Sequence, residues 1–180
     1  RSKDGELVVC HDENLSRLAG VDSFVWDLTY EELAGLNIAA HTDETHRMPR
    51  LSEVLKLVEE SGLKLNIELK NSLQFYPGME DDVLSLVAAA GVIEQVCYSS
   101  FNHASMAKMA ASGHGAVCGL LTANIVFEPV AYAVRCGVGA WHPLLNSLLQ
   151  ENYVRDCHAA GLKVHVWTAD EPDYINAGLA

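Results

Sequence analysis

The chain has 180 residues, a length typical of one domain, and 49% of them are apolar while 20% are charged. This is the composition of a folded globular protein, and it excludes disordered, collagen-like and low-complexity chains. Twelve Lys and Arg against 24 Asp and Glu give a net charge of −12, which disfavours binding to nucleic acid or to anionic lipid. The longest nearly unbroken apolar run, Val83–Ile93, is too short to span a bilayer, so we expect no integral membrane segment.

Five cysteines lie far apart and form no C-x-x-C pair. This spacing excludes a disulfide framework and a zinc ribbon. We expect most of the cysteines to act as small buried hydrophobic residues, and the protein to lie in a reducing compartment. We therefore expect a cytoplasmic protein. The chain begins with Arg1 inside a polar turn, so we expect it to be a piece of a longer protein, and it gives no sign of whether a signal peptide precedes it.

The first fifty residues predict one strand and a surface segment. Glu6–Asp12 is apolar at first and ends in Cys10-His11-Asp12, which is typical of a strand running into a polar loop. Thr29-Tyr30-Glu31-Glu32 is a capping box that predicts a helix start. His41–Arg50 is rich in charge, so we expect residues from about 13 to 50 to form an excursion on the surface.

From residue 50 onward, short apolar runs alternate with helical stretches that end at glycines. Such alternation predicts a parallel sheet with crossover helices. The predicted strands are Leu63–Lys70, Gln95–Phe101, Ala116–Thr122, Gly139–Pro143 and Leu162–Thr168. The predicted helices are Ser52–Gly62, Met79–Ile93, Asn102–Gly113, Val126–Gly137 and Asn146–Gly161, with a last one opening at Asp170-Glu171-Pro172.

The choice of α/β architecture lies between a doubly wound open sheet and a (β/α)8 TIM barrel. No G-x-G-x-x-G or G-x-x-x-x-G-K turn occurs, as a nucleotide-binding open sheet would show. The repeats are short and no long insertion breaks them, which favours the barrel. A complete barrel needs ~250 residues. We therefore predict that residues 1–180 are a single TIM-barrel domain that is incomplete at both ends.

Glu68 and Lys70 are the leading candidate site residues. In the run Leu65–Lys70 the side chains alternate, so Asn66, Glu68 and Lys70 share one face and the leucines and Ile67 share the other. The apolar set has to pack against helices, which directs the polar set into the barrel. One interpretation is an ion pair at the rim. The sharper one is that Glu68 binds a hard divalent cation while Lys70 offers positive charge to an anionic substrate.

Three further residues follow predicted strands. His11 is either an exposed turn histidine or a group for proton transfer. His142, within Trp141-His142-Pro143, has either a structural or substrate-shaping role or a catalytic one. Trp167 is either a core residue or an aromatic wall for the substrate, and we favour the wall. The other histidines, His165 among them, show no ligand spacing, and Ser99-Ser100 has no G-x-S-x-G frame for a serine nucleophile.

Several segments carry a family resemblance in the same order along the chain: KDGELVVCHD, DLTYEEL, MPRLSEVLKL, LNIELK, YSSFN, WHP and VHVWTADEP. With them the sequence resembles the glycerophosphodiester phosphodiesterases, which are metal-dependent barrel hydrolases. The resemblance implies cleavage of glycerophosphodiesters to sn-glycerol 3-phosphate and an alcohol, and with it a place in glycerol and lipid metabolism. It implies one divalent ion, Ca²⁺ or Mg²⁺, bound partly by Glu68. It further implies general acid/base catalysis by His11, phosphate binding by Lys70 and an aromatic substrate wall at Trp167.

The chain also departs from the family pattern. The family's opening His-Arg-Gly, Glu-Asn and Glu-x-Asp segments do not occur, and Leu18-Ala19 stands where threonines are usual. We therefore expect these 180 residues alone to be inactive. Two alternatives stay open, namely a lyase that uses Lys70 as a Schiff-base amine and a barrel that has lost its site. The expected partners are a small phosphodiester and a second copy of the chain in a homo-oligomer, with no nucleic acid.

Overall fold

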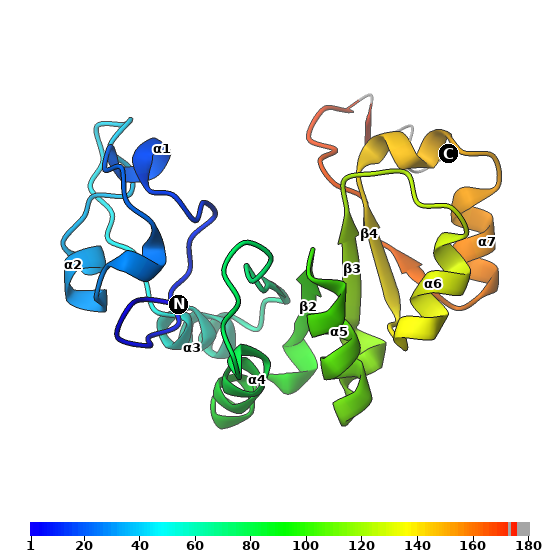
Figure 1. Ribbon diagram of the computed structural model, residues 1–180, viewed down its shortest axis with the longest axis horizontal. Helices are drawn as coiled ribbons and strands as arrows, with labels where there is room; N and C mark the ends of the chain where they lie inside the picture. Colours follow the sequence, from blue (N-terminus) through cyan, green and yellow to red (C-terminus); the bar gives the residue numbers. More distant parts are fainter. Residues whose placement is uncertain (173, 176–180) are drawn as a thin grey trace. The chain divides into compact units, whose positions relative to one another are not determined.

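A computed structural model of the protein describes residues 1–172 and 174–175 (Figure 1). The chain divides into two compact units. Unit 1 comprises Arg1–Lys64 and Asp81–Gln95, and unit 2 comprises Leu65–Glu80 and the chain from Val96 onward. Among the described residues, no helix has both the length and the apolar character needed to cross a membrane.

Unit 1 is built mainly from short helices and loops. It contains α1 (Ser16–Ala19), α2 (Tyr30–Ala34), α3 (Leu51–Ser61) and most of α4 (Met79–Ala89), together with 3₁₀ turns at Val25–Asp27 and Ile93–Gln95. The predicted capping box is present, because the side chain of Thr29 accepts from the Glu32 amide and the Glu32 carboxylate accepts from the Thr29 amide. The segment predicted as a surface excursion has its own apolar cluster, formed by Leu15, Val25, Leu33 and Met48.

The predicted strand Glu6–Asp12 is wrong. Val8 makes a single antiparallel bridge with Arg50, supported by hydrogen bonds from Val9 N to Pro49 O (2.9 Å) and from Leu51 N to Leu7 O (2.8 Å). The apolar run that was expected to form the strand is short and is followed at once by Cys10-His11-Asp12. The pairing therefore stops after one bridge.

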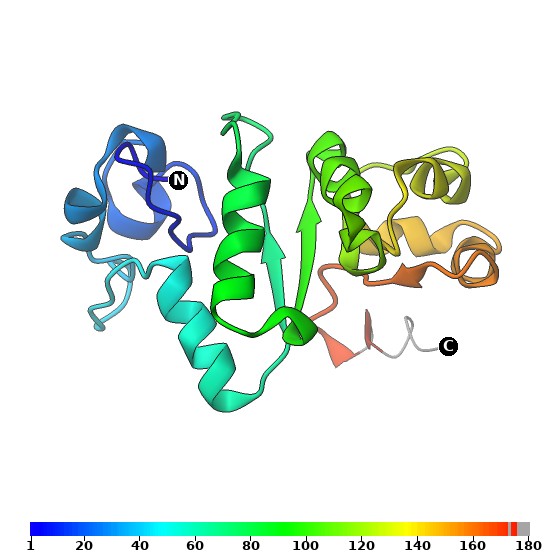
Figure 2. The same cartoon turned by 90° about the horizontal axis from the view of Figure 1, so that it is seen from below.

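Unit 2 contains a parallel sheet of five strands in the order β1-β2-β3-β4-β5. The strands are β1 (Leu65–Glu68), β2 (Val96–Ser100), β3 (Cys118–Thr122), β4 (Ala140–Pro143) and β5 (Lys163–Val164). In Figure 2, β1 and β2 lie side by side with their arrowheads in the same direction. The predicted parallel α/β arrangement is therefore confirmed, and closure into an eight-stranded barrel stays a prediction.

The helices of unit 2 connect successive strands. They are α5 (His103–Met109), which runs into a π turn at Ala110–His114 and a 3₁₀ turn at Gly115–Val117, then α6 (Pro129–Cys136), a 3₁₀ turn at Leu145–Leu149 and α7 (Tyr153–Ala159). Helix α5 packs against β2 and β3 (Figure 1). The predicted last helix begins with a hydrogen bond from Ile175 N to Glu171 O (3.0 Å), and the rest of it lies outside the described residues.

Two predicted helices differ from the structure. The stretch Asn146–Gly161 is not one helix, because Asn152 adopts a left-handed conformation (φ +63°) just before α7. Asparagine tolerates that conformation better than most residues, so it can separate two helical turns. The stretch Val126–Gly137 becomes helical only at Pro129, whose fixed φ suits the first turn of α6.

The two faces of the sheet differ in chemistry. Strand register places Leu65, Ile67, Val96, Tyr98, Leu120 and Trp141 on one face, and α5 packs against the β2 and β3 part of the sheet. We call the opposite face the polar face; it carries Asn66, Glu68, Cys97, Ser99, Gly119, Leu121, Ala140 and His142. Asn66 Nδ2 donates to Ser99 Oγ across this face (3.0 Å). The alternation predicted for Leu65–Lys70 thus holds in the sheet.

Candidate active site

Glu68 and Lys70 lie together where β1 ends. Lys70 Nζ is 2.8 Å from Glu68 Oε1, and the two side chains are 30% and 27% exposed. The amide of Leu69, between them, donates to Ser99 O (2.8 Å), so the pairing with β2 continues beyond the last strand residue. A carboxylate and an ammonium are therefore fixed side by side at the carboxyl end of a parallel strand, where α/β folds place their ligands.

A buried polar network holds the chain directly after Lys70. Asn71 is 3% exposed, and its Nδ2 donates to Ser105 Oγ (2.9 Å) while its Oδ1 lies 3.0 Å from Ser100 Oγ. The main-chain oxygen of Asn71 accepts from Asn102 Nδ2 (3.0 Å), and Ser105 Oγ donates to Glu80 Oε1 (2.6 Å). Both polar atoms of the Asn71 side chain thus have a hydrogen-bond partner within 3.0 Å. The network therefore fixes the segment that follows Lys70.

His142 fills a space that glycine leaves open. It is 6% exposed, and a side-chain carbon on Gly119 of the neighbouring strand would overlap the imidazole ring. Its Nε2 lies 2.9 Å from Nδ1 of His165. Burial, and then the neighbouring His165, lower the pKa of His142 to about 4, so its ring is neutral near pH 7.

Trp167 is hydrogen-bonded to the end of the strand that carries His142. Its indole Nε1 donates to His142 O (2.9 Å), and its main-chain amide donates to Pro143 O (3.1 Å). The ring of Phe101, 41% exposed, meets the Trp167 ring edge to face at a centroid distance of 5.7 Å. An aromatic pair therefore stands at the carboxyl end of the sheet. That Trp167 forms a wall for the substrate stays a prediction.

His165 contacts the predicted site residue His142, a relationship that the sequence analysis missed. The interpretation of it as a surface or core histidine rested on ligand spacing along the chain, yet its partner His142 is 23 residues away on the adjacent strand. A signal was available: His165 is two residues before Trp167, so strand alternation places the two on one face. Phe101 was missed for a similar reason, since it was counted only as the end of a strand.

His11 belongs to unit 1 and has its own partners there. Its side chain is 76% exposed, and its Nδ1 lies 2.6 Å from Asp12 Oδ1. Arg17 donates to the same carboxylate from Nε (2.6 Å) and from Nη2 (2.8 Å). These hydrogen bonds, first from Arg17 and then from His11, lower the pKa of Asp12. An ionised carboxylate thus orients the imidazole ring of His11.

The predicted divalent cation needs more oxygen ligands than Glu68 alone supplies. Glu68 offers one carboxylate, whereas Ca²⁺ or Mg²⁺ takes six or more oxygen ligands in all. Within residues 1–172 and 174–175, no group of three or more His, Cys, Asp or Glu side chains is arranged to hold a metal ion. Glu68 suits the role of a single ligand, and the described residues do not complete a site around it.

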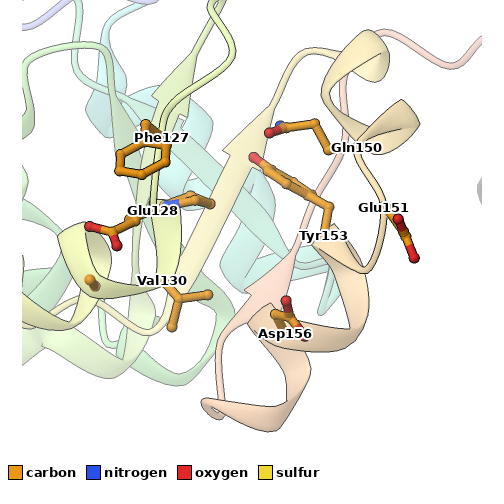
Figure 3. Close-up of a pocket in the computed structure, with 9 residues that line it drawn as sticks. Phe127, Glu128, Val130, Gln150, Glu151, Tyr153 and Asp156 are labelled. Atoms are coloured by element: carbon orange, nitrogen blue, oxygen red, sulfur yellow. The ribbon is translucent and has the colours of Figure 1, made fainter.

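A separate groove of about 520 Å³ lies on unit 2 (Figure 3). Phe127, Glu128 and Val130 form one wall of it, and Gln150 and Tyr153 face them from the other. None of the predicted site residues lines this groove. It lies against α6 and α7, on the helix-covered side of the sheet, and is thus distinct from the polar face.

The chain was compared with known proteins. Residues 1–179 match the model of the glycerophosphoryl diester phosphodiesterase family. This chain belongs to that family. A glycerophosphodiester phosphodiesterase of Caldanaerobacter subterraneus subsp. tengcongensis is 33% identical over 99% of this chain and 76% of its own length.

Two solved structures show the same fold. One is a Galdieria sulphuraria protein assigned as a glycerophosphodiester phosphodiesterase. It is 26% identical, with a TM-score of 0.84, and the match covers 99% of this chain and 74% of that one. The other, an Oleispira antarctica phosphodiesterase in complex with the product sn-glycerol-3-phosphate, is 23% identical with a TM-score of 0.80, covering 99% and 73%.

For this member of the glycerophosphoryl diester phosphodiesterase family, the predicted site residues fall into three groups. Glu68 and Lys70 form an ion pair, and His142 and Trp167 are joined by a hydrogen bond; all four belong to unit 2. His11 stands with Asp12 in unit 1. That His11 joins the other four at one site stays a prediction.

Proposed function

We propose that the protein hydrolyses glycerophosphodiesters to sn-glycerol 3-phosphate and an alcohol. The observation that carries the proposal is the pairing of Glu68 and Lys70 at the carboxyl end of β1 in a chain of this family. The ligand named for the Oleispira phosphodiesterase supports the same product. In the net reaction, the bond between phosphorus and the alcohol oxygen breaks, water supplies the new oxygen on phosphorus, and a proton passes to the departing alcohol.

Each proposed role follows from the chemistry of the side chain. Lys70 binds the phosphate, because an ammonium stabilises the negative charge that grows on the phosphoryl oxygens in the transition state. His11 moves protons, with Asp12 and Arg17 orienting its ring. Trp167 and His142 shape the space for the substrate.

A divalent cation is part of the proposal. Glu68 would be one of its ligands, and Ca²⁺ or Mg²⁺ would supply further charge stabilisation at the phosphate when bound. Chelation with EDTA is expected to abolish hydrolysis, and adding back either ion is expected to restore it. Full activity after exhaustive chelation would contradict the metal requirement while leaving the hydrolase proposal standing.

The ion pair favours this function over the Schiff-base lyase. A Schiff-base lysine reacts as a free amine, whereas Lys70 is engaged by a carboxylate at 2.8 Å. The direct test is release of sn-glycerol 3-phosphate from glycerophosphocholine by the intact protein, with Lys70→Met and His11→Ala variants in parallel. Both variants are expected to lose at least about a hundredfold in kcat/KM. If the wild-type protein releases no product with Ca²⁺ or Mg²⁺ present, the proposed function is wrong.

A further inference from the structure

The polar face continues beyond β5 to include His165. The amides of Lys163, His165 and Trp167 donate in turn to Gly139 O (3.0 Å), Trp141 O (2.9 Å) and Pro143 O (3.1 Å) of the neighbouring chain segment. This regular parallel ladder, with Ala140 opposite Lys163, places His165 opposite His142. Lys163, His165 and Trp167 consequently share the polar face with His142.

The orientation of His165 is fixed through one of its two ring nitrogens. Its Nδ1 lies 2.9 Å from Nε2 of His142, and His142 is itself held in the space over Gly119. His142 is buried whereas His165 is exposed. The second nitrogen of His165, Nε2, is thus left for an outside partner on a ring that cannot turn without losing its hydrogen bond.

The surroundings of His165 select the kind of partner. Partial burial, and then the charge of Lys163, lower the pKa of His165, and the pKa of His142 is also lowered, so both rings favour the neutral form. The charged pair Glu68 and Lys70 stands on β1, at the opposite end of the strand order from β5. Next to His165 the polar face carries the aromatic pair Phe101 and Trp167. A neutral polar group beside an aromatic wall suits an uncharged, hydroxyl-bearing part of a ligand.

A hydroxyl group fits both ways of sharing the proton between the two rings. If His165 Nδ1 donates to His142, then His165 Nε2 is an acceptor; if His142 donates, then His165 Nε2 carries a hydrogen and is a donor. A hydroxyl can complement either arrangement because it both donates and accepts. A phosphate oxygen without a proton can only accept, so it complements only the arrangement in which His165 Nε2 is a donor.

We propose that His165 is a specificity residue that hydrogen-bonds, through Nε2, the glycerol hydroxyl farther from the phosphate. The inference rests on the proposed function and adds to it the group that recognises the glycerol end. It assigns phosphate binding and glycerol recognition to opposite ends of the strand order, Lys70 at β1 and His165 beyond β5.

The test compares two substrates in each protein. One is glycerophosphocholine, and the other is its analogue made from propane-1,2-diol, which lacks only the terminal hydroxyl and keeps the hydroxyl next to the phosphodiester. The measured quantity is the ratio of the two kcat/KM values, in which partial loss of folded protein cancels. The variants are His165→Phe, which keeps a ring without a hydrogen-bonding atom, and His165→Gln, which places an amide near the position of Nε2. The matched control is His158→Phe on the exposed side of α7.

The wild-type protein and His158→Phe are expected to favour glycerophosphocholine about tenfold, as for the loss of one neutral hydrogen bond. The His165→Phe ratio is expected to fall close to one, and His165→Gln is expected to recover most of the preference. If His165→Phe keeps the wild-type ratio, or if the wild-type ratio is already one, the proposal is wrong although hydrolysis stands. If the wild-type protein hydrolyses neither substrate, the proposed function itself fails, and the inference falls with it.

Discussion

Lys70 Nζ lies 2.8 Å from Glu68 Oε1 in a pair whose side chains are each between a quarter and a third exposed. At that exposure an ion pair adds about 1 kcal/mol or less to the free energy of unfolding. The pair is thus poorly explained as a stabilising contact. Its position where β1 ends agrees better with a role in binding.

Replacing Lys70 should separate these roles. In Lys70→Met we expect the free energy of unfolding in urea to change by about 1 kcal/mol or less and kcat/KM for glycerophosphocholine to fall at least about a hundredfold. The control is Lys56→Met, which removes an ammonium 3.8 Å from Glu60 on the exposed side of α3 and should leave hydrolysis unchanged. A Lys70→Met protein that is markedly less stable yet fully active would assign the ion pair to stability alone.

The network around Asn71 should matter for both stability and turnover. Asn71→Ala removes two buried side-chain hydrogen bonds, the one that Asn71 Nδ2 donates to Ser105 Oγ and the one that Asn71 Oδ1 accepts from Ser100 Oγ, at a cost of about 1–3 kcal/mol. Because the same network fixes the segment after Lys70, kcat should also fall, with a smaller change in KM. Urea unfolding and steady-state kinetics measure the two effects. Asn37→Ala is the control, since the Asn37 side chain makes three hydrogen bonds in a half-buried loop of unit 1. Equal kinetic losses in both variants would argue against a positioning role.

Arg17 should act on catalysis through Asp12 and His11. Arg17→Ala removes two hydrogen bonds to Asp12 and leaves that carboxylate, and with it the His11 ring, less restrained. We expect kcat to fall about tenfold, a fraction of what a general acid or base contributes, with KM little changed. Arg155→Ala removes a similar pair of hydrogen bonds, to Asp156 on α7, and should have no kinetic effect. Wild-type kcat in Arg17→Ala would show that His11 needs no such support.

Gly119 and His142 should show strong coupling. Gly119→Ala places a methyl group where the His142 ring lies, and such overpacking typically costs about 1–3 kcal/mol. In Gly119→Ala/His142→Ala the space is free, so the double variant should be more stable than the sum of the single changes predicts. Urea unfolding of the four proteins gives the coupling. Additive effects would mean that the two residues do not compete for space.

Acid should destabilise unit 2 through His142. The pKa of His142 is about 4 in the folded protein against 6.5 in the unfolded chain. Between these values the unfolded state binds more protons, so the free energy of unfolding should increase from pH 4 to pH 6.5 and lose this dependence above it. His165 is the titrating group that contacts His142, and Lys163 acts in turn on His165. The difference between wild type and His142→Gln, measured in urea from pH 4 to pH 7, isolates the contribution; parallel curves would contradict it.

The parallel sheet could be predicted because its signals are local. Short apolar runs separated by amphipathic stretches specify strand and crossover, and Gly62 and Gly137 end their helices in the left-handed conformation that favours glycine. Glu68 and Lys70 could be placed on one face from strand alternation alone. These inferences use residues that are neighbours in sequence.

What could not be predicted depends on contacts between distant residues. The role inferred for His165 depends on its hydrogen bond with His142 on the adjacent strand. The role of Asn71 depends on hydrogen bonds with serines about 30 positions away. The break at Asn152 needs a left-handed residue that the helical pattern does not require. The strand expected at Glu6–Asp12 failed because pairing depends on a partner segment, and Arg50 provides a single bridge.

The fit of the His142 ring over Gly119 has a consequence for the family's variation. The two positions draw on one small volume, so a larger residue at one leaves room only for a smaller residue at the other. Across homologous sequences the pair should therefore co-vary, with histidine at the second position found only beside glycine at the first.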